Sequence, residues 1–254
     1  MNKKSIRSTL LPFFVMGCVF FAIIAIWEIV VIFLHISPVT LVAPSEIYPL
    51  IIHKWPLFLK ELLFTYYEIG WGWILGNGMG VICAICLYQF KNASKTLVSI
   101  SVFINAVPLV ALSAIIAGII GTTPESKICI VALICFFPMF ISALTGFTRL
   151  PTKQRDLFKT YSANRIQLFC HLVFPHGLPF IMTALKLSTL SAIFAAITSE
   201  FFGSHGGIGQ LILANRGLYN LAMVWGAIFY LVVTGALFYF SIGYLQKRIV
   251  FWMK

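Results

Sequence analysis

Charged side chains are scarce in this sequence of 254 residues. It holds 18 Lys and Arg and 7 Asp and Glu, together 10% of the chain, whereas a soluble domain typically carries about 25%. Hydrophobic residues make up 60%, and the mean hydropathy is +0.98. So few charges cannot cover a soluble surface, and this composition excludes an ordinary soluble domain. It also argues against nucleic-acid binding, which requires basic residues clustered on a folded, soluble face.

The ten-residue alternation of polar and apolar side chains that is typical of outer-membrane barrels is absent as well. Long apolar runs are present instead, and about 20 helical residues cross a hydrocarbon layer of about 30 Å. Because a backbone in lipid must satisfy its own hydrogen bonds, these runs predict helices. We expect an all-α, polytopic membrane protein, with residues 1–254 forming a single transmembrane domain. The six predicted spans are Phe13–His35, Leu62–Tyr88, Thr96–Ile120, Ile128–Phe147, Ile181–Phe202 and Leu221–Tyr244.

Cysteine is present but lacks the pattern of a disulfide framework or a zinc site. Five of the six cysteines lie within or at the edge of apolar spans. Cys83-x-x-Cys86 has metal-ligand spacing, but a structural zinc site needs four ligands and no second pair follows. We interpret these cysteines as packing residues and expect neither a metal nor a cofactor.

Motifs of enzyme active sites are also missing. The five histidines lie in or beside the predicted loops, and neither an H-E-x-x-H run nor a paired-carboxylate site occurs. The sequence also lacks a G-x-x-x-x-G-K-[ST] run, the loop that cradles the phosphates of ATP. We therefore expect that the chain is not an enzyme and that any ATP hydrolysis takes place on a separate subunit.

The basic residues are distributed unevenly between the two sides of the predicted spans. Four residues, Lys54, Lys60, Lys127 and Arg216, fall on one side, and Lys186 lies near the start of the fifth span. The other 13 basic residues fall on the opposite side, and such an excess marks the cytoplasmic side. We expect both termini in the cytoplasm of a bacterial inner membrane. The other side carries 13: Lys3, Lys4, Arg7, Lys91, Lys95, Arg149, Lys153, Arg155, Lys159, Arg165, Lys247, Arg248 and Lys254.

Two predicted spans contain residues that suggest contacts inside the membrane. Gly72, Gly76 and Gly80 lie on one face of the second span at four-residue spacing, which favours close helix packing over a substrate role. In the third span, Asn105 and Pro108 interrupt an apolar helix. They either line a water-filled path or mark a kink bonded to a neighbouring helix, and the sequence favours neither interpretation.

A segment on the outer side, between the first two spans, has a mixed composition. In the run Ala43-Pro44-Ser45-Glu46-Ile47-Tyr48, Ser45 is placed to cap a short helix. A surface helix and an irregular linker are equally compatible with this run.

The cytoplasmic segment 149–179 is the longest interruption between predicted spans in the second half of the chain. Leu157, Phe158 and Tyr161 fall on one helical face, and a second short helix is indicated around Leu168 to Val173. Pro175 and Pro179 are expected to end this second helix before the fifth span. The two helices either present an apolar ridge to a soluble partner or lie on the membrane surface, with their basic residues near anionic lipid.

This segment resembles the cytoplasmic signature of the permeases of bacterial, binding-protein-dependent ABC importers. The signature reads Glu-Ala-Ala, three residues, Gly, nine residues, Ile, one residue, Leu-Pro. Both alanines are replaced here by larger residues, and the glycine by a serine. The matching positions, at the same spacing, are Asp156-Leu157-Phe158, Ser162, Leu172 and Phe174-Pro175.

Other stretches are similar to the nitrate, sulfonate and taurine branch of that family, so the resemblance covers nearly the whole chain. One position departs from it, because Glu68 stands where that branch commonly has arginine. The similar stretches are Trp27-Glu28, Ala43-Pro44-Ser45, Gly72 to Gly80, Ala163 to Phe169, Pro175 to Pro179, Ser199 to Gly203 and Gly206 to Ile212.

The resemblance implies a MetI-like (type I) importer permease and a set of partners. Two permease copies, expected to form a homodimer, would enclose the pore, and two cytoplasmic ATPase subunits would drive it. An extracytoplasmic binding protein would deliver the solute. The helix from Asp156 to Ser162 would seat in a groove of the ATPase, so the residues expected to couple the two subunits are Asp156, Leu157, Phe158, Tyr161, Ser162, Leu172 and Pro175.

The solute and its path are less well defined by the sequence. The branch suggests a sulfonate, taurine or nitrate, and similar relatives carry thiamine-related pyrimidines or flavins. An ion-coupled carrier is a further alternative, although the spans hold few acids beyond Glu28, Glu68 and Glu200. Glu200 is a candidate for the translocation path because it is an ionisable group near the end of a span. The favoured interpretation is structural, because the glycine-rich turn that follows offers free N–H groups for its carboxylate to bind.

Overall fold

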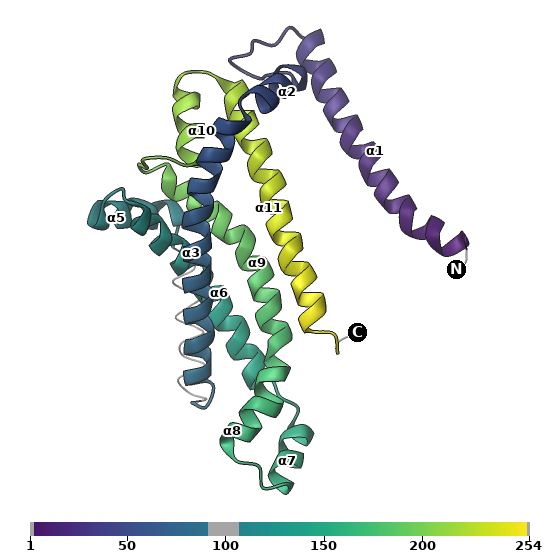
Figure 1. Ribbon diagram of the computed structural model, residues 1–254, viewed down its shortest axis with the longest axis vertical. Coiled ribbons are helices and arrows are strands. Elements are labelled where there is room, and N and C mark those ends of the chain that lie inside the picture. The colour runs from purple at the N-terminus through teal and green to yellow at the C-terminus, as the bar shows by residue number, and fades with distance from the viewer. Residues whose placement is uncertain (1–2, 91–106, 253–254) are drawn as a thin grey trace. The chain divides into compact units, whose positions relative to one another are not determined.

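The computed structural model describes residues 3–90 and 107–252, and within these ranges the chain forms helices and turns without β-strands. The predicted all-α class is therefore confirmed. The helices are α1 (Lys3–Phe33), α2 (Pro44–His53), α3 (Trp55–Leu87), α5 (Leu109–Ile120), α6 (Pro124–Thr148), α7 (Thr152–Thr160), α8 (Arg165–Leu168), the π-turn η1 (Phe169–Val173), α9 (Phe174–Glu200), α10 (Ile208–Gly217) and α11 (Leu221–Ile249) (Figure 1).

Four of these helices are long and apolar enough to cross a membrane. They are Trp55–Leu87, Pro124–Thr148, the continuous helix Arg165–Glu200 and Leu221–Ile249. Two shorter apolar helices, Gly17–Phe33 and Leu109–Ile120, match the predicted first span and the end of the third. The rest of the third span and Asn105 lie outside the described residues. Helix α5 starts directly after Pro108, which is its N-cap residue.

Close contacts between chain segments divide the protein into two compact units. One comprises Met1–Phe58 and Ile212–Phe229, and the other comprises Leu59–Leu211 and Tyr230–Lys254. The larger unit contains the main core, in which α6 and α9 run side by side (Figure 1). Where they cross, a Cβ on Gly146 would stand 2.9 Å from the Cα of Gly177. The two glycines therefore let the helices approach closely enough to interlock.

In the smaller unit, α1 is tied to the start of α2. The Ser45 hydroxyl donates a hydrogen bond to Oε1 of Glu28 at 2.6 Å, and the Ser45 N–H donates to Oε2 at 3.0 Å. The predicted cap position was wrong, because the helix begins at Pro44 after Ala43, and Ser45 lies inside its first turn. A glutamate from another helix thus holds this N-terminus, where a negative charge is stabilising. Of the two interpretations left open for the segment, the short helix is the one observed.

The expected break at Pro175 and Pro179 is also wrong. The helix runs from Arg165 to Glu200 without interruption, with five residues in a π-turn. Pro175 lies in the first turn of α9, and in an α-helix its ring would crowd the carbonyl of residue 171. The wider π-turn lies directly before the proline, where that carbonyl is displaced from its α-helical position, so the chain continues as a helix.

Candidate functional site

Helix α7 ends in a tight turn at the position where the family signature has glycine. Ser162 has a φ of 52°, which places it in the left-handed region. The N–H of Ala163 donates to the carbonyl of Phe158 at 3.1 Å. A left-handed residue followed by a bond across six residues is the Schellman motif, which normally uses glycine. The signature spacing therefore marks a helix end, and Ser162 adopts the same conformation at some steric cost.

The next helix starts at once and is held by a capping box. The side chain of Asn164 accepts a hydrogen bond from the N–H of Gln167 at 2.8 Å, and the Gln167 side chain accepts one from the N–H of Asn164 at 2.9 Å. This reciprocal pair satisfies two otherwise free donors at the start of α8. Residues 152–168, called here the α7–α8 corner, are thus fixed on both sides of the bend.

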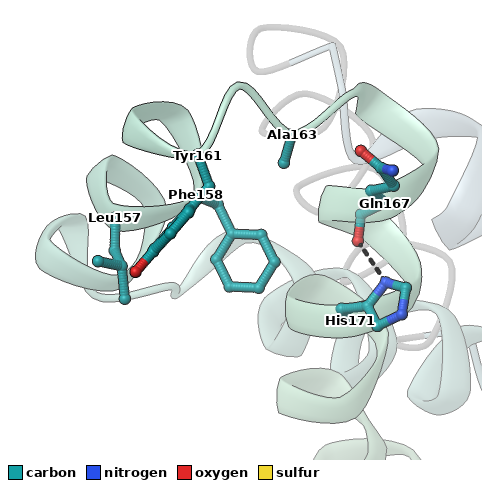
Figure 2. Close-up of a pocket in the computed structure, with 6 residues that line it drawn as sticks. All are labelled: Leu157, Phe158, Tyr161, Ala163, Gln167 and His171. Carbon is teal, nitrogen blue, oxygen red and sulfur yellow. Dashed lines mark hydrogen bonds between the residues drawn. The ribbon is translucent and has the colours of Figure 1, made fainter.

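The α7–α8 corner encloses a hollow of about 370 Å³. Figure 2 shows the Phe158 ring pointing from α7 toward α8, opposite Gln167 and His171. The His171 ring lies against its own helix, and its Nδ1 donates to the carbonyl of Gln167 at 3.1 Å. The hollow is largely apolar, and Gln167 and His171 form its polar side. Its lining consists of Leu157, Phe158, Tyr161, Ala163, Gln167 and His171.

The apolar side chains of the corner are poorly covered by the rest of the chain. Leu157 is 54% exposed, Tyr161 79% and Ile166 74%. The same two helices carry exposed basic side chains, namely Lys153 and Arg155 on α7 and Arg165 on α8. Burying a leucine or tyrosine of this kind stabilises by roughly 1.5–3 kcal/mol, so leaving several of them exposed in one patch is costly. A contiguous apolar patch with a polar rim is the usual form of a protein contact surface.

The structure brings together only some of the residues that the sequence assigned to this site. Leu157, Phe158 and Tyr161 share the hollow, and Ser162 forms the bend beside them. Asp156 is exposed on α7 and does not line the hollow. Leu172 and Pro175 lie further along, in the π-turn and at the start of α9, where both are half-buried. Their place is at the base of the corner and not at its tip.

That base is an aromatic cluster built around Phe147 of α6. Its ring lies 5.8 Å from Phe169 and 6.5 Å from Phe174, measured between centroids, and Tyr88, directly after α3, packs 6.1 Å away. In an α-helix, residues five apart differ by about 140° in direction, because each residue adds about 100°. In the π-turn the N–H of Phe174 bonds the carbonyl of Phe169, which aligns the two rings on one face. The π-turn thus anchors the corner to the span below it.

Glu200, a candidate for the translocation path, is the last residue of α9 and is fully buried against the start of α10. Its carboxylate accepts hydrogen bonds from the hydroxyl of Thr65 at 2.7 Å and from the N–H groups of Gly209 and Gln210. Thr65 in turn accepts from the N–H of Ile208 at 2.8 Å. These contacts are the ones expected if Glu200 has a structural role, in which its carboxylate binds free N–H groups of the following turn. A role in translocation stays a prediction.

One further side chain completes this arrangement. The carboxylate of Glu61 accepts from the N–H of Gly207 at 2.7 Å, and Gly207 has a φ of 106° that favours glycine. All four N–H groups that a helix leaves unpaired at its start are therefore bonded to α3 or α9. The sequence pointed to Glu200 but gave no sign of the contributions from Glu61 and Thr65.

Two more buried ionisable side chains interact with Glu200. Lys127, counted from the sequence as a loop residue, is fully buried in the first turns of α6, and its ammonium interacts electrostatically with Glu68 and Glu200. Glu68 is also fully buried. A cation near a helix N-terminus is unfavourable, and the carboxylate of Glu200 offsets it. The position of Lys127 directly before the apolar run at Ile128 is the sequence signal that would have identified it.

Gly72, Gly76 and Gly80 of α3 lie against α6. A Cβ on Gly72 would come 2.5 Å from the side chain of Val131, and one on Gly80 would come 2.9 Å from the carbonyl of Phe136. A Cβ on Gly76 would overlap the backbone of Ala132. The glycine face is thus where the backbones of the two helices approach each other.

Comparison with known proteins adds a family to this geometry. The family model for the binding-protein-dependent transport system inner membrane component matches residues 76–251. The chain is 27% identical to a probable ABC transporter permease protein of Haemophilus influenzae, an alignment that covers 83% of this chain and 91% of that one.

Two further relatives are named for different solutes. The formylaminopyrimidine transport permease ThiX of Halalkalibacterium halodurans is 25% identical, with 92% of this chain and 94% of that one covered. The putative aliphatic sulfonates transport permease SsuC of Bacillus subtilis is 25% identical, with 91% and 84% covered. Among solved structures, the MetNI methionine ABC transporter in an inward-facing conformation matches with a TM-score of 0.62 at 15% identity, covering 76% of this chain and 94% of that one.

Proposed function

Because the chain belongs to the family of binding-protein-dependent transport system inner membrane components, we propose that its α7–α8 corner docks an ATPase subunit. The chain is a membrane permease subunit of an ABC importer and not itself an enzyme. Its energy comes from ATP hydrolysis on a separate chain. The question that the sequence raised, whether segment 149–179 lies on lipid or meets a soluble partner, is answered in this proposal by the partner.

A single observation carries the proposal, namely the exposed apolar patch around a hollow on a rigid corner. Membrane-surface helices bury their apolar face in lipid while their basic residues contact headgroups. Here Phe158 points inward to the hollow and Leu157 and Tyr161 surround it, so the apolar residues form a concave patch. A concave apolar patch suits a protruding side chain of a protein better than it suits acyl chains.

The corner is built to transmit force. The Schellman turn at Ser162 and the capping box at Asn164 fix the bend, and the aromatic cluster at Phe147 fixes its base. When the ATPase subunits close on ATP, a push on α7 moves the π-turn and α9 as one piece, because no flexible linker separates them. Leu172 and Pro175 act in this step at the base, not by touching the ATPase.

We assign the remaining features of the importer in the same way. Two copies of the chain form the pore as a homodimer, both termini lie in the cytoplasm, and an extracytoplasmic binding protein supplies the solute. The solute is a small sulfonate, taurine or nitrate, supported by the sulfonate permease among the relatives. A pyrimidine related to thiamine is the second candidate, supported by the formylaminopyrimidine permease.

The docking proposal is tested by Phe158→Asp in the tagged, full-length chain. An aspartate there places an unpaired charge in the apolar interface, so binding of the ATPase is expected to fall at least a hundredfold. The measurement is the ATP-hydrolysing activity that copurifies with the chain from its native membrane. Gln154→Asp is the matched control, because Gln154 is exposed on α7 and does not line the hollow.

Undiminished copurification with Phe158→Asp contradicts the docking proposal. The solute is tested separately, by ATP-dependent uptake of labelled taurine and labelled formylaminopyrimidine into cells that carry the complete system. Uptake of the pyrimidine alone would overturn the assignment to sulfonates and leave the docking site intact.

A further inference from the structure

Glu68 of α3 is a buried acid whose carboxyl lacks hydrogen-bond donors. It is fully buried, and neither of its oxygens accepts a bond from an N–H group or hydroxyl of the described residues. Glu200, by contrast, accepts bonds from the hydroxyl of Thr65 and from the N–H groups of Gly209 and Gln210. An ionised carboxylate that is buried without donors is costly, and such a group commonly becomes neutral instead. The two acids therefore differ in how well their surroundings support a negative charge.

The charges around Glu68 do not balance when both acids are ionised. The carboxyl of Glu68 interacts with that of Glu200, and the ammonium of Lys127 interacts with both. Lys127 is fully buried, and its Nζ donates to the hydroxyl of Ser126 at 3.3 Å. One cation facing two carboxylates leaves one negative charge uncompensated, and a neighbouring carboxylate disfavours the ionisation of the other. A single bound proton would make the group of three side chains neutral.

The other acids and bases nearby do not supply this missing charge. Lys127 and Glu200 are the ionisable side chains that interact with Glu68. Glu61, two turns earlier in α3, is itself an acid and binds the N–H of Gly207. Glu125, at the start of α6, is exposed, and α5 contains no ionisable residue.

We propose that Glu68 binds a proton at neutral pH and donates it in a hydrogen bond to the carboxylate of Glu200. The proton resides on Glu68 because three donors stabilise the negative charge of Glu200 and none stabilises a charge on Glu68. Lys127 then faces a single carboxylate. The membrane-spanning helices therefore contain a proton-binding site next to the start of α10.

Loss of this proton would weaken the contact between α3 and α9 on which α10 depends. Two carboxylates would repel each other beside Thr65, whose hydroxyl joins Glu200 to the N–H of Ile208. In the unfolded chain Glu68 is an ordinary carboxyl that has already released its proton at neutral pH. The folded chain thus binds one proton more than the unfolded chain, and its stability falls as the pH rises through the neutral range.

The proton is tested by infrared spectroscopy of the purified, full-length chain in a detergent without ester groups. A protonated carboxyl has a C=O band separate from those of carboxylates, and the chain has only 7 Asp and Glu in total, so a single group can be resolved. We expect this band at pH 7, and we expect Glu68→Gln to remove it. Glu28→Gln is the matched control and keeps the band, because the Glu28 carboxylate accepts both bonds from Ser45.

Two results of the infrared experiment would overturn the proposal. Absence of the band from the unsubstituted chain would show that both acids are ionised. A band that persists in Glu68→Gln and disappears in Glu200→Gln would place the proton on Glu200.

A second measurement is equilibrium unfolding of the unsubstituted chain and of Glu68→Gln in mixed detergent micelles, between about pH 6 and 8. The ratio of their folding constants, unsubstituted chain to variant, is expected to fall about tenfold per pH unit, because only the unsubstituted chain releases this proton on unfolding. The glutamine amide still donates to Glu200, so the variant is expected to fold. A ratio that does not change with pH would contradict the proposal, and such a ratio is what we expect for Glu28→Gln.

Discussion

The start of α10 and the α7–α8 corner are both polar interruptions between apolar helices, and they are built in opposite ways. At α10, three side chains from α3 and α9 bond every free N–H, and Glu200 and Thr65 are fully buried. At the corner, the backbone is equally well capped, yet Leu157 and Tyr161 are exposed. The first region is completed by the chain itself. In the second region the backbone hydrogen bonds are satisfied, but apolar side chains are exposed, as we expect of a docking surface.

The largest expected effect comes from the buried region. Glu200→Ala removes the acceptor for Thr65, Gly209 and Gln210 and leaves these donors buried, at a cost of about 3–5 kcal/mol in the free energy of unfolding. The melting temperature of the purified chain in detergent measures this loss. Phe158→Asp is expected to leave the melting temperature unchanged, because Phe158 stabilises a complex and not the chain.

The comparison of these two variants needs a control, and one outcome would contradict it. Glu46→Ala removes an exposed acid from the first turn of α2 and is expected to lower the melting temperature only slightly. A melting temperature lowered as much by Phe158→Asp as by Glu200→Ala would erase the difference between the two regions, since the corner would then belong to the folded core.

A smaller effect is expected at α2, whose N-terminus is also held by a distant glutamate. Glu28→Ala removes both bonds to Ser45, but water replaces them at this partly exposed site, so the loss is about 1 kcal/mol. The same melting experiment measures it, with Glu28→Gln as the variant that keeps one acceptor. A loss as large as that of Glu200→Ala would show that burial does not determine how much each of these glutamates contributes to the free energy of unfolding.

An effect of similar size has the opposite sign. Ser162→Gly removes the strain of a left-handed serine and is expected to stabilise the α7–α8 corner by about 1 kcal/mol. Hydrogen exchange of the Ala163 amide reports it directly, because this N–H closes the turn. Faster exchange in the glycine variant would contradict the Schellman assignment. Ser204→Gly is the control at a serine where no left-handed φ occurs.

The sequence predicted the parts of this fold that depend on local pattern. Apolar runs located the four long spans, and periodicity placed Leu157, Phe158 and Tyr161 together. Prediction from the sequence failed where a residue's role depends on residues that are distant in the chain. Pro175 was expected to end a helix, because the π-turn that accommodates it is not visible in composition. Lys127 was counted as a loop charge, because its burial depends on carboxylates about 60 and 70 residues away.

The contacts at the start of α10 also follow the order in which the chain is synthesised. Glu61, Thr65 and Glu200 all precede α10 in the sequence, so during synthesis each acceptor leaves the ribosome before the N–H groups that it will bind. Helix α10 therefore never needs to wait for a later segment to satisfy its first turn. The glycines at 206, 207 and 209 keep that turn compact as it meets its acceptors. The first turn of α10 is therefore capped only where α3 and α9 are already in place.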